Sequence, residues 1–213
     1  ETRLRGTGEA VLDIPSPSTG SISSKYSSST GPWQLIWSGG STRQHGVGLL
    51  LSSAWQQALL EHTAINDRLL LARFQCQGSI TLSAVVAYAP TDGGSDADLD
   101  RKQQFYLQLY STLQRVQRRD LVVLLGDFNA QIGDMLPSHQ HIRGPHSVQP
   151  QAATDNGMRL LDLASAQRLV LANTLFEHKQ IHQYTHQLAP MQNQPGKERV
   201  IDYILCSSRF RSS

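Results

Sequence analysis

The chain has 213 residues, with 19 basic and 17 acidic side chains, a formal net charge of +2 and 39% hydrophobic residues. This length fits one α/β domain or two small ones. The near-neutral balance gives no strong electrostatic footprint for nucleic acid, although a local basic rim on a neutral body is compatible with it. No apolar run reaches the ~18 residues that a membrane-spanning helix needs.

Two cysteines, Cys76 and Cys206, are too few for a disulfide framework in a chain of this length. We therefore predict reduced thiols that lie within strands. No secretory signal is visible in the sequence. Together these observations predict an intracellular protein.

The first 90 residues contain a polar segment followed by short apolar runs. Residues 15–32 are rich in Ser, Gly and Pro and have almost no apolar content, which predicts a mobile loop. The apolar runs predict strands of an antiparallel meander, with turn signals between some of them. A short helix over 55–62 is expected between two of these strands. The predicted strands are Trp33–Trp37, Val47–Leu51, Arg68–Phe74 and Ile80–Tyr88.

The rest of the chain alternates helices with strands. Apolar residues recur at helical spacing from Leu99 to Val116 and predict an amphipathic helix that ends near Arg118, where basic residues suit the helix dipole. The uninterrupted apolar run Leu121–Leu125 predicts a strand that is buried on both faces. This alternation, beside the meander, predicts an α/β sandwich. The remaining predicted elements are a long loop over 130–156, a helix over about 157–167, and strands at Leu169–Ala172 and Val200–Leu205.

The sharpest candidate for chemistry is Gly126-Asp127-Phe128-Asn129, which begins where a buried strand ends. In open α/β sheets, ligands bind beyond the carboxyl ends of the strands. At that place the Asp127 carboxylate can accept a proton from water, and the Asn129 amide can hold a phosphate oxygen. The alternative is a simple Asp/Asn turn.

Two further strand tips carry polar side chains. Tyr88 precedes Ala89-Pro90 and places a phenol at the end of a strand, although Tyr-Ala-Pro is also a common strand ending. Asp202 stands between apolar neighbours in the last strand, and a buried charge of that kind needs a partner or a metal. The alternative is an edge strand with Asp202 facing solvent.

Five stretches of the sequence occur in a characteristic order: Glu1-Thr2-Arg3-Leu4, Tyr88-Ala89-Pro90-Thr91, Gly126-Asp127-Phe128-Asn129-Ala130, Asn173-Thr174-Leu175-Phe176 and Ile201-Asp202-Tyr203-Ile204-Leu205. With His45-Gly46-Val47-Gly48 and Asp155-Asn156-Gly157, they resemble the endonuclease/exonuclease/phosphatase superfamily. The chain is most similar to endonuclease domains of LINE-type retrotransposons and to craniofacial development protein 2-like proteins. The resemblance covers nearly the whole chain. It implies one domain over 1–213 with a DNase I-like fold, a sandwich of two mixed or antiparallel β-sheets flanked by helices.

The resemblance implies a role for five residues. Glu1 would bind a divalent metal, usually Mg²⁺, with Mn²⁺ as an alternative. Asp127 would activate or orient the attacking water, and Asn129 would position the surroundings of Asp127 and the phosphate. Tyr88 would lie near the scissile phosphate, and Asp202 would orient a histidine close to the C-terminus. These residue types suit phosphodiester hydrolysis, which needs charge neutralisation, an in-line water and help for the leaving oxygen.

The printed sequence departs from the family pattern in three places. It starts at Glu1, after the strand in which the family carries an Asn, and no Ser-Asp-His motif follows Asp202. In Tyr184-Thr185-His186, a histidine stands where the family usually has a tryptophan next to the threonine, which removes an aromatic wedge for DNA. The resemblance therefore implies a domain that is incomplete at both ends, and we expect impaired cleavage by this chain.

The eight histidines suggest a second metal hypothesis. His139, His141 and His146 form one spaced group, and His178, His182 and His186 recur every four residues, which would line one face of a helix. Both groups lie in polar, Gln-rich segments, so exposed loop histidines are the expected interpretation.

Three functions remain open from the sequence. The first is a Mg²⁺-dependent DNA endonuclease of the retrotransposon type, which would act in the nucleus. The second is a phosphatase or phosphodiesterase for a small phosphorylated molecule, and the third is a non-catalytic domain that binds a partner, although no obligate protein partner is evident. The basic excess between Lys179 and Arg211 is either a solvated surface or a rim that contacts phosphates.

Overall fold

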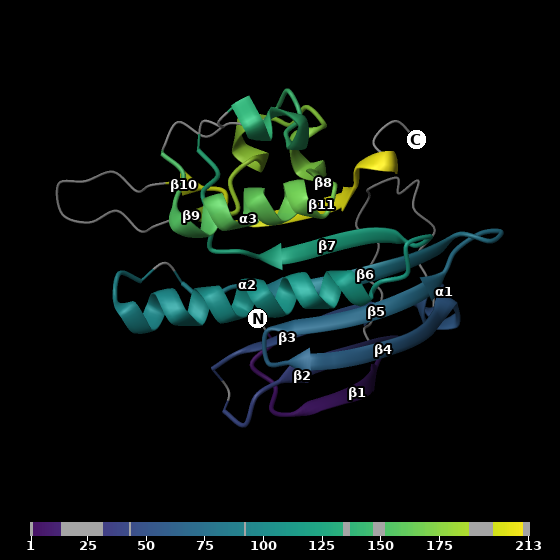
Figure 1. Ribbon diagram of the computed structural model, residues 1–213. Helices are drawn as coiled ribbons and strands as arrows, with labels where there is room; N and C mark the ends of the chain where they lie inside the picture. The colour runs from purple at the N-terminus through teal and green to yellow at the C-terminus, as the bar shows by residue number, and fades with distance from the viewer. Residues whose placement is uncertain are drawn as a thin grey trace.

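The computed structural model describes residues 2–13, 32–42, 44–91, 93–133, 137–146, 152–187 and 198–210. These ranges form two main β-sheets, with helices on one side of the larger sheet (Figure 1). The loop predicted over 15–32 lies outside the described residues except for Pro32, and so does Glu1. Within these ranges, no helix is both long and apolar enough to cross a membrane.

A six-stranded mixed sheet forms the centre of the molecule. Its strands β6 and β7 run parallel, and all its other neighbours pair antiparallel. A parallel pair needs a long crossover, and the helix α2 (Asp96–Arg115) provides it. The carboxyl ends of β6 and β7 therefore lie at one edge, where β11 begins. In spatial order the strands are β4 (Leu59–Asn66), β5 (Leu69–Gln75), β6 (Thr81–Tyr88), β7 (Leu121–Asp127), β11 (Asp202–Ser207) and β8 (Leu169–Leu171).

A smaller antiparallel sheet packs on one face of β4, β5 and β6. It contains β1 (Thr7–Leu12), β2 (Trp33–Gly39) and β3 (Gly46–Leu51), and Figure 1 shows β1 and β2 at the bottom of the view. Buried Ile36 and Leu51 contact the large sheet in a cluster that includes Phe74 and Val86. The short helix α1 (Ser53–Ala58) then leads from β3 into β4. Burial between the two sheets thus explains the sandwich that the sequence predicted.

Two helices cover the opposite face of the large sheet (Figure 1). In α2, a capping box of Ser95 and Asp98 starts the helix, and Phe105 and Leu109 reach the core. The helix α3 (Asp155–Ala166) starts at the N-cap Thr154. The same core contains Leu124 and Tyr203 from the sheet, so the two helices and β7 and β11 bury a common interior.

The shorter elements lie around α3 and the last strand. They are the 3-10 helices η1 (Pro137–Ile142), η2 (Ala172–Thr174), η3 (Gln180–His182) and η4 (Ser208–Phe210), and the two-stranded ribbon of β9 (His186–Gln187) and β10 (Glu198–Arg199).

The structure corrects several predicted elements. The expected meander is divided, because β2 and β3 belong to the small sheet and β5 and β6 to the large one. The helix predicted over 55–62 ends at Ala58, where pairing with β5 makes the next residues strand β4. The strand β1 was missed because Thr7–Leu12 is mostly exposed and shows no apolar alternation.

One prediction of burial and one of strand position were also wrong. In Leu121–Leu125 only Leu124 is fully buried, because the small sheet packs on β4, β5 and β6 and leaves one face of β7 partly open. Both cysteines are free, as predicted, but Cys76 follows β5 instead of lying within it.

Candidate active site

Tyr88, Asp127 and Asp202 form a row across three neighbouring strands. Tyr88 ends β6, Asp127 ends β7 and Asp202 begins β11, and the strand registers pair Tyr88 with Asp127 and Asp127 with Asp202. Register partners on adjacent strands point to the same side of a sheet. Val86 and Leu125, two residues earlier, pack between the two sheets. The row therefore faces the side of the small sheet, at the edge where the strands end.

Asp127 is a half-buried carboxylate with a like charge beside it. Burial raises its pKa most strongly, and the charge of Asp202 raises it further. The backbone N–H of Asn129, which donates to Asp127 Oδ1 at 2.8 Å, and the nearby His186 act in the opposite direction, but the net shift is upward. Two close carboxylates with one raised pKa favour either proton uptake or a bound cation.

Gly126 lets β7 approach β6 closely at this point. Its φ is +145°, and a Cβ there would lie 1.9 Å from the carbonyl oxygen of Ala87. Beyond it, Ala89 N–H donates to Asp127 O at 2.8 Å and Phe128 N–H donates to Ile201 O at 2.9 Å. These contacts hold the exits of β6 and β7 and the approach to β11 together around Asp127.

Asn129 occupies a left-handed backbone conformation, with φ of +46°. Asn tolerates this region better than most residues. Its Nδ2 donates to Ala89 O at 2.9 Å, while Phe128 before it is completely buried. The side chain that the family resemblance assigns to phosphate positioning thus also ties the β7 exit to the β6 exit.

Arg68 and His45 adjoin the phenol, although they were not selected as site residues from the sequence. The Arg68 guanidinium lies 5.0 Å from the Tyr88 ring centroid and donates to Tyr88 O at 3.0 Å. Its Nη2 lies 3.0 Å from His45 Nε2. Arg68 directly precedes β5, which runs antiparallel to β6, and this position is the sequence signal that could have placed it at the same edge.

Thr185 holds the start of β11. Its Oγ1 accepts from the backbone N–H of Ile201 at 3.0 Å and of Asp202 at 3.2 Å. The next residue, His186, lies in β9 and is near enough to Asp127 to influence its pKa. The residue that replaces the expected tryptophan is therefore within electrostatic reach of Asp127.

The histidine groups do not form a zinc site in the part of the chain that the structure describes. No three His, Cys, Asp or Glu side chains there converge in a way that could hold a metal ion. His182 lies in η3 and His186 in β9, so the four-residue spacing does not fall on one helix. His139 corrects the expectation of exposure, because it is buried and its Nε2 contacts Asp162 Oδ1 at 3.1 Å.

Comparison with known proteins assigns the chain to a family. Residues 3–213 match the Endonuclease/Exonuclease/phosphatase family. The chain belongs to this family. The superfamily resemblance predicted from the ordered motifs is thereby confirmed.

Two relatives of this endonuclease/exonuclease/phosphatase domain are craniofacial development protein 2 from Tragulus javanicus, 33% identical, and from Bos taurus, 31% identical, each over 175 residues and 81% of the chain. The chain spans 28% and 27% of the length of these two relatives. The predicted likeness to craniofacial development protein 2 is therefore confirmed for a part of those proteins.

The domain also resembles two solved structures. One is a 3′-5′ exonuclease, NExo, from Neisseria meningitidis, with a TM-score of 0.57, 16% identity, and coverage of 84% of this chain and 69% of the other. The second is the 3′ phosphatase NExo from Neisseria bound to a product DNA hairpin, with a TM-score of 0.54, 17% identity, and coverage of 85% and 69%. At these identities the likeness shows the fold, and it confirms the predicted DNase I-like class.

Proposed function

We propose that this domain hydrolyses phosphodiester bonds in DNA at the edge formed by Tyr88, Asp127 and Asp202, with a bound divalent cation. The observation that carries the proposal is the register of β6, β7 and β11, which aligns a phenol and two carboxylates in one row. The raised pKa of Asp127 and the family membership support it. On the family resemblance we further propose a single domain, an origin related to LINE-type retrotransposons and action in the nucleus.

The donor set at this edge suits Mg²⁺, with Mn²⁺ as an alternative. Mg²⁺ prefers one or two carboxylates together with waters and phosphate oxygens, and Asp127 and Asp202 lie side by side. We propose these two as holding residues, with Glu1 as a further ligand from the resemblance. When bound, Mg²⁺ would neutralise charge on the phosphodiester and make water more acidic.

The side chains of the chain itself would carry out the remaining tasks. Asp127 would orient the attacking water through its carboxylate, as the family resemblance implies. Asn129 would orient the phosphate through its amide, and Tyr88 would lie beside the scissile bond. Asp202 would help Asp127 to hold the cation, and Arg68 would place a permanent positive charge under the phenol ring.

Plasmid nicking tests the proposal. Supercoiled DNA would be incubated with Mg²⁺ or Mn²⁺ and the chain, a longer form from its genomic locus, and the Asp127→Asn and Asp202→Asn variants of each. Asp100→Asn, an exposed carboxylate on α2, is the matched control. We expect nicking to fall by about 10²- to 10⁴-fold in the Asp127 variant and to stay at the parent rate in the control.

The outcomes separate the alternatives. Nicking by the longer form alone would support the site and show that it needs residues outside 1–213. No nicking by either form with either metal, in folded protein, would contradict the proposed activity. If the protein also binds no Mg²⁺ in calorimetry, a non-catalytic partner-binding domain becomes the better explanation.

A phosphatase acting on a small molecule is the second candidate, favoured by the modest net charge of +2. One of the structural neighbours is itself described as a 3′ phosphatase. Salt dependence separates the two, because DNA binding releases counterions and weakens steeply with salt, whereas a small phosphate ester is affected far less. A cleavage rate that changes little between about 50 and about 200 mM salt would favour the small substrate.

A further inference from the structure

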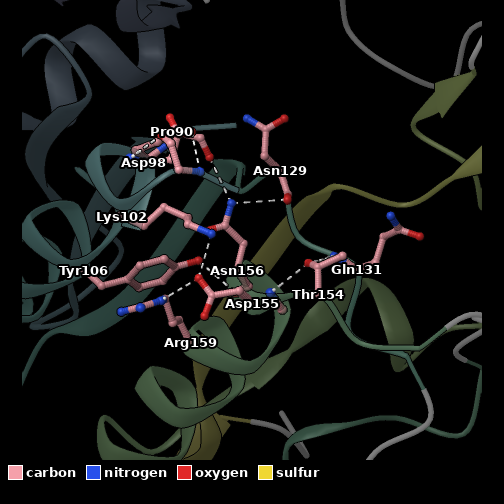
Figure 2. Close-up of polar contacts among 12 residues, drawn as sticks. Pro90, Asp98, Lys102, Tyr106, Asn129, Gln131, Thr154, Asp155, Asn156 and Arg159 are labelled. Atoms are coloured by element: carbon pink, nitrogen blue, oxygen red, sulfur yellow. Dashed lines mark hydrogen bonds and ion pairs between the residues drawn. The ribbon is translucent and has the colours of Figure 1, made fainter. Parts of the chain in front are cut away.

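The first turn of α3 is tied to the two loops that leave β6 and β7. Asn156 is completely buried, and its Nδ2 donates to Pro90 O at 2.9 Å and to Asn129 O at 3.3 Å (Figure 2). Pro90 is two residues beyond Tyr88, and Asn129 is two residues beyond Asp127. One amide group therefore joins the exits of the two strands that end in the proposed catalytic row.

The backbone beyond Asn129 is held by the same turn. Thr154 N–H donates to Gln131 O at 2.9 Å, and Gln131 N–H donates back to Thr154 Oγ1 at 3.2 Å. Gly157 lies so close that a Cβ on it would be 2.0 Å from Gln131 O. The helix start and the loop thus touch backbone to backbone, and a shift of one would move the other.

The helix α2 anchors this turn from the other side, as Figure 2 shows. Lys102, 1% exposed, places its Nζ 2.8 Å from Asp155 Oδ2, and Arg159 Nε donates to the same oxygen at 2.9 Å. The hydrogen bond from Lys102 is the main cause of the lowered pKa of Asp155. Tyr106 OH donates to the backbone oxygen of Asn156 at 3.0 Å. The position of Asn156 is therefore fixed independently of the loops that it binds.

A left-handed φ costs a non-glycine residue on the order of 1–3 kcal/mol and persists only when its surroundings hold it. At Asn129 three contacts do so: its N–H donates to Asp127 Oδ1, its Nδ2 donates to Ala89 O, and its carbonyl accepts from Asn156. Of the residues that make these contacts, only Asn156 belongs to the helix layer. An apolar side chain of similar size would leave the Pro90 and Asn129 carbonyls without this donor.

We infer that Asn156 is a positioning residue for the reaction: by holding the Pro90 and Asn129 carbonyls it sets where Asn129 and Asp127 stand relative to Tyr88. This inference rests on the proposed hydrolysis, but it assigns Asn156 no contact with substrate. Its effect on the rate passes through the loop 128–131.

The first experiment compares Asn156→Leu, which keeps the volume and removes the donors, with Ser165→Ala, which changes the same helix α3 and leaves the Asn156 amide and its anchoring contacts intact. Steady-state cleavage of an oligonucleotide would be measured in whichever form is active. We expect kcat to fall about 10²-fold with KM within about threefold for Asn156→Leu, because misplacement by about 1 Å costs that much. Ser165→Ala should keep kcat within about threefold of the parent.

Amide hydrogen exchange gives a readout that does not require activity. In metal-free buffer, residues 127–133 should exchange at least about tenfold faster in Asn156→Leu, while β5 keeps the parent rate. In Ser165→Ala, the exchange rates of residues 127–133 should stay within about twofold of the parent.

Unchanged exchange at 127–133 in Asn156→Leu would overturn the inference, and so would an equal loss of kcat in both variants. If neither this chain nor its longer form cleaves DNA, the proposed function fails, and the exchange measurement still decides whether Asn156 holds the loop.

Discussion

Asp127 shows how a single residue can favour chemistry at the expense of stability. Burial and the charge of Asp202 raise its pKa in the folded chain. The ionised carboxylate is therefore less favourable in the folded state than in the unfolded state. Such a group lowers the free energy of unfolding at pH values above its raised pKa, and this loss is relieved as the pH falls through that pKa.

The substitution Asp127→Asn should therefore raise the free energy of unfolding at pH 7 in metal-free buffer. The amide removes the charge, and its Oδ1 can still accept from the Asn129 N–H. Urea denaturation with EDTA, followed from neutral to acidic pH, measures the difference, which should shrink as the parent carboxylate becomes protonated. A less stable variant at pH 7 would contradict the role of burial and of Asp202.

Tyr88 offers a second test at the scale of one residue. Tyr88→Phe keeps the ring beside Arg68 and His45 and removes only the hydroxyl. We expect cleavage to fall by about 10²-fold, as when a single polar group at a reacting centre is lost. The free energy of unfolding should change by less than about 1 kcal/mol in the same protein batch. An unchanged cleavage rate would mean that the phenol only packs against the site.

At the scale of elements, the first turn of α3 contacts the loop that leaves β7. The cap Thr154 satisfies both Gly157 N–H in the helix and Gln131 N–H in the loop. Helix periodicity and the cap indicate where such a helix begins, but they say nothing about the loop that it touches. The approach of Gly157 to Gln131 O makes this turn a contact surface as well as a helix end.

Replacing Gly157 by Ala should destabilise the protein by about 1–3 kcal/mol, although Ala is the better helix former. The added Cβ would lie 2.0 Å from Gln131 O, so the helix and the loop must separate. Thermal unfolding would measure the loss. Ser165→Ala, later in the same helix, should change stability by less than about 0.5 kcal/mol and serves as the control. If Gly157→Ala were more stable than the parent, the loop would have to move away from the added Cβ at little cost in free energy.

At the scale of the whole molecule, Asp120 joins three strands at the end of the sheet opposite to Asp127. Its carboxylate accepts from Arg73 on β5 at 2.6 Å, and from Thr81 and Ser83 on β6. Burial alone would raise its pKa, but these hydrogen bonds outweigh it and lower the pKa to about 2. Its backbone oxygen also accepts from Arg209 in η4. The network ties β5, β6 and the start of β7 together at this end of the sheet.

Asp120→Asn should lower the free energy of unfolding by about 2 kcal/mol at pH 7. Because the folded pKa is depressed, this contribution is present above the ordinary value of 3.8 and disappears as the pH falls through about 2. Urea denaturation of parent and variant from pH 7 to pH 2 would follow it. The free energy of unfolding of the control Asp100→Asn should equal that of the parent at every pH. If the difference in the free energy of unfolding between parent and variant stays constant down to pH 2, the charge of the carboxylate is not its cause.

The sequence by itself determined what is local. Tyr88, Asp127 and Asp202 could be selected because each stands at the end of an apolar run or between apolar neighbours, and the structure places all three at strand ends. The helices α2 and α3 were predicted close to their observed bounds, because periodicity and caps depend on residues a few positions apart. The two-sheet sandwich followed from the order of strands and helices together with the family resemblance.

Only the tertiary structure decided how the local pieces meet. Strand pairing created the row of Tyr88, Asp127 and Asp202 and divided the expected meander between two sheets. It also brought Arg68 to Tyr88, and it brought the Asn156 amide to Pro90, 66 positions earlier in the chain. The physical reason is that register and buried polar contacts are set by packing between distant segments, and no pattern of neighbouring residues encodes them.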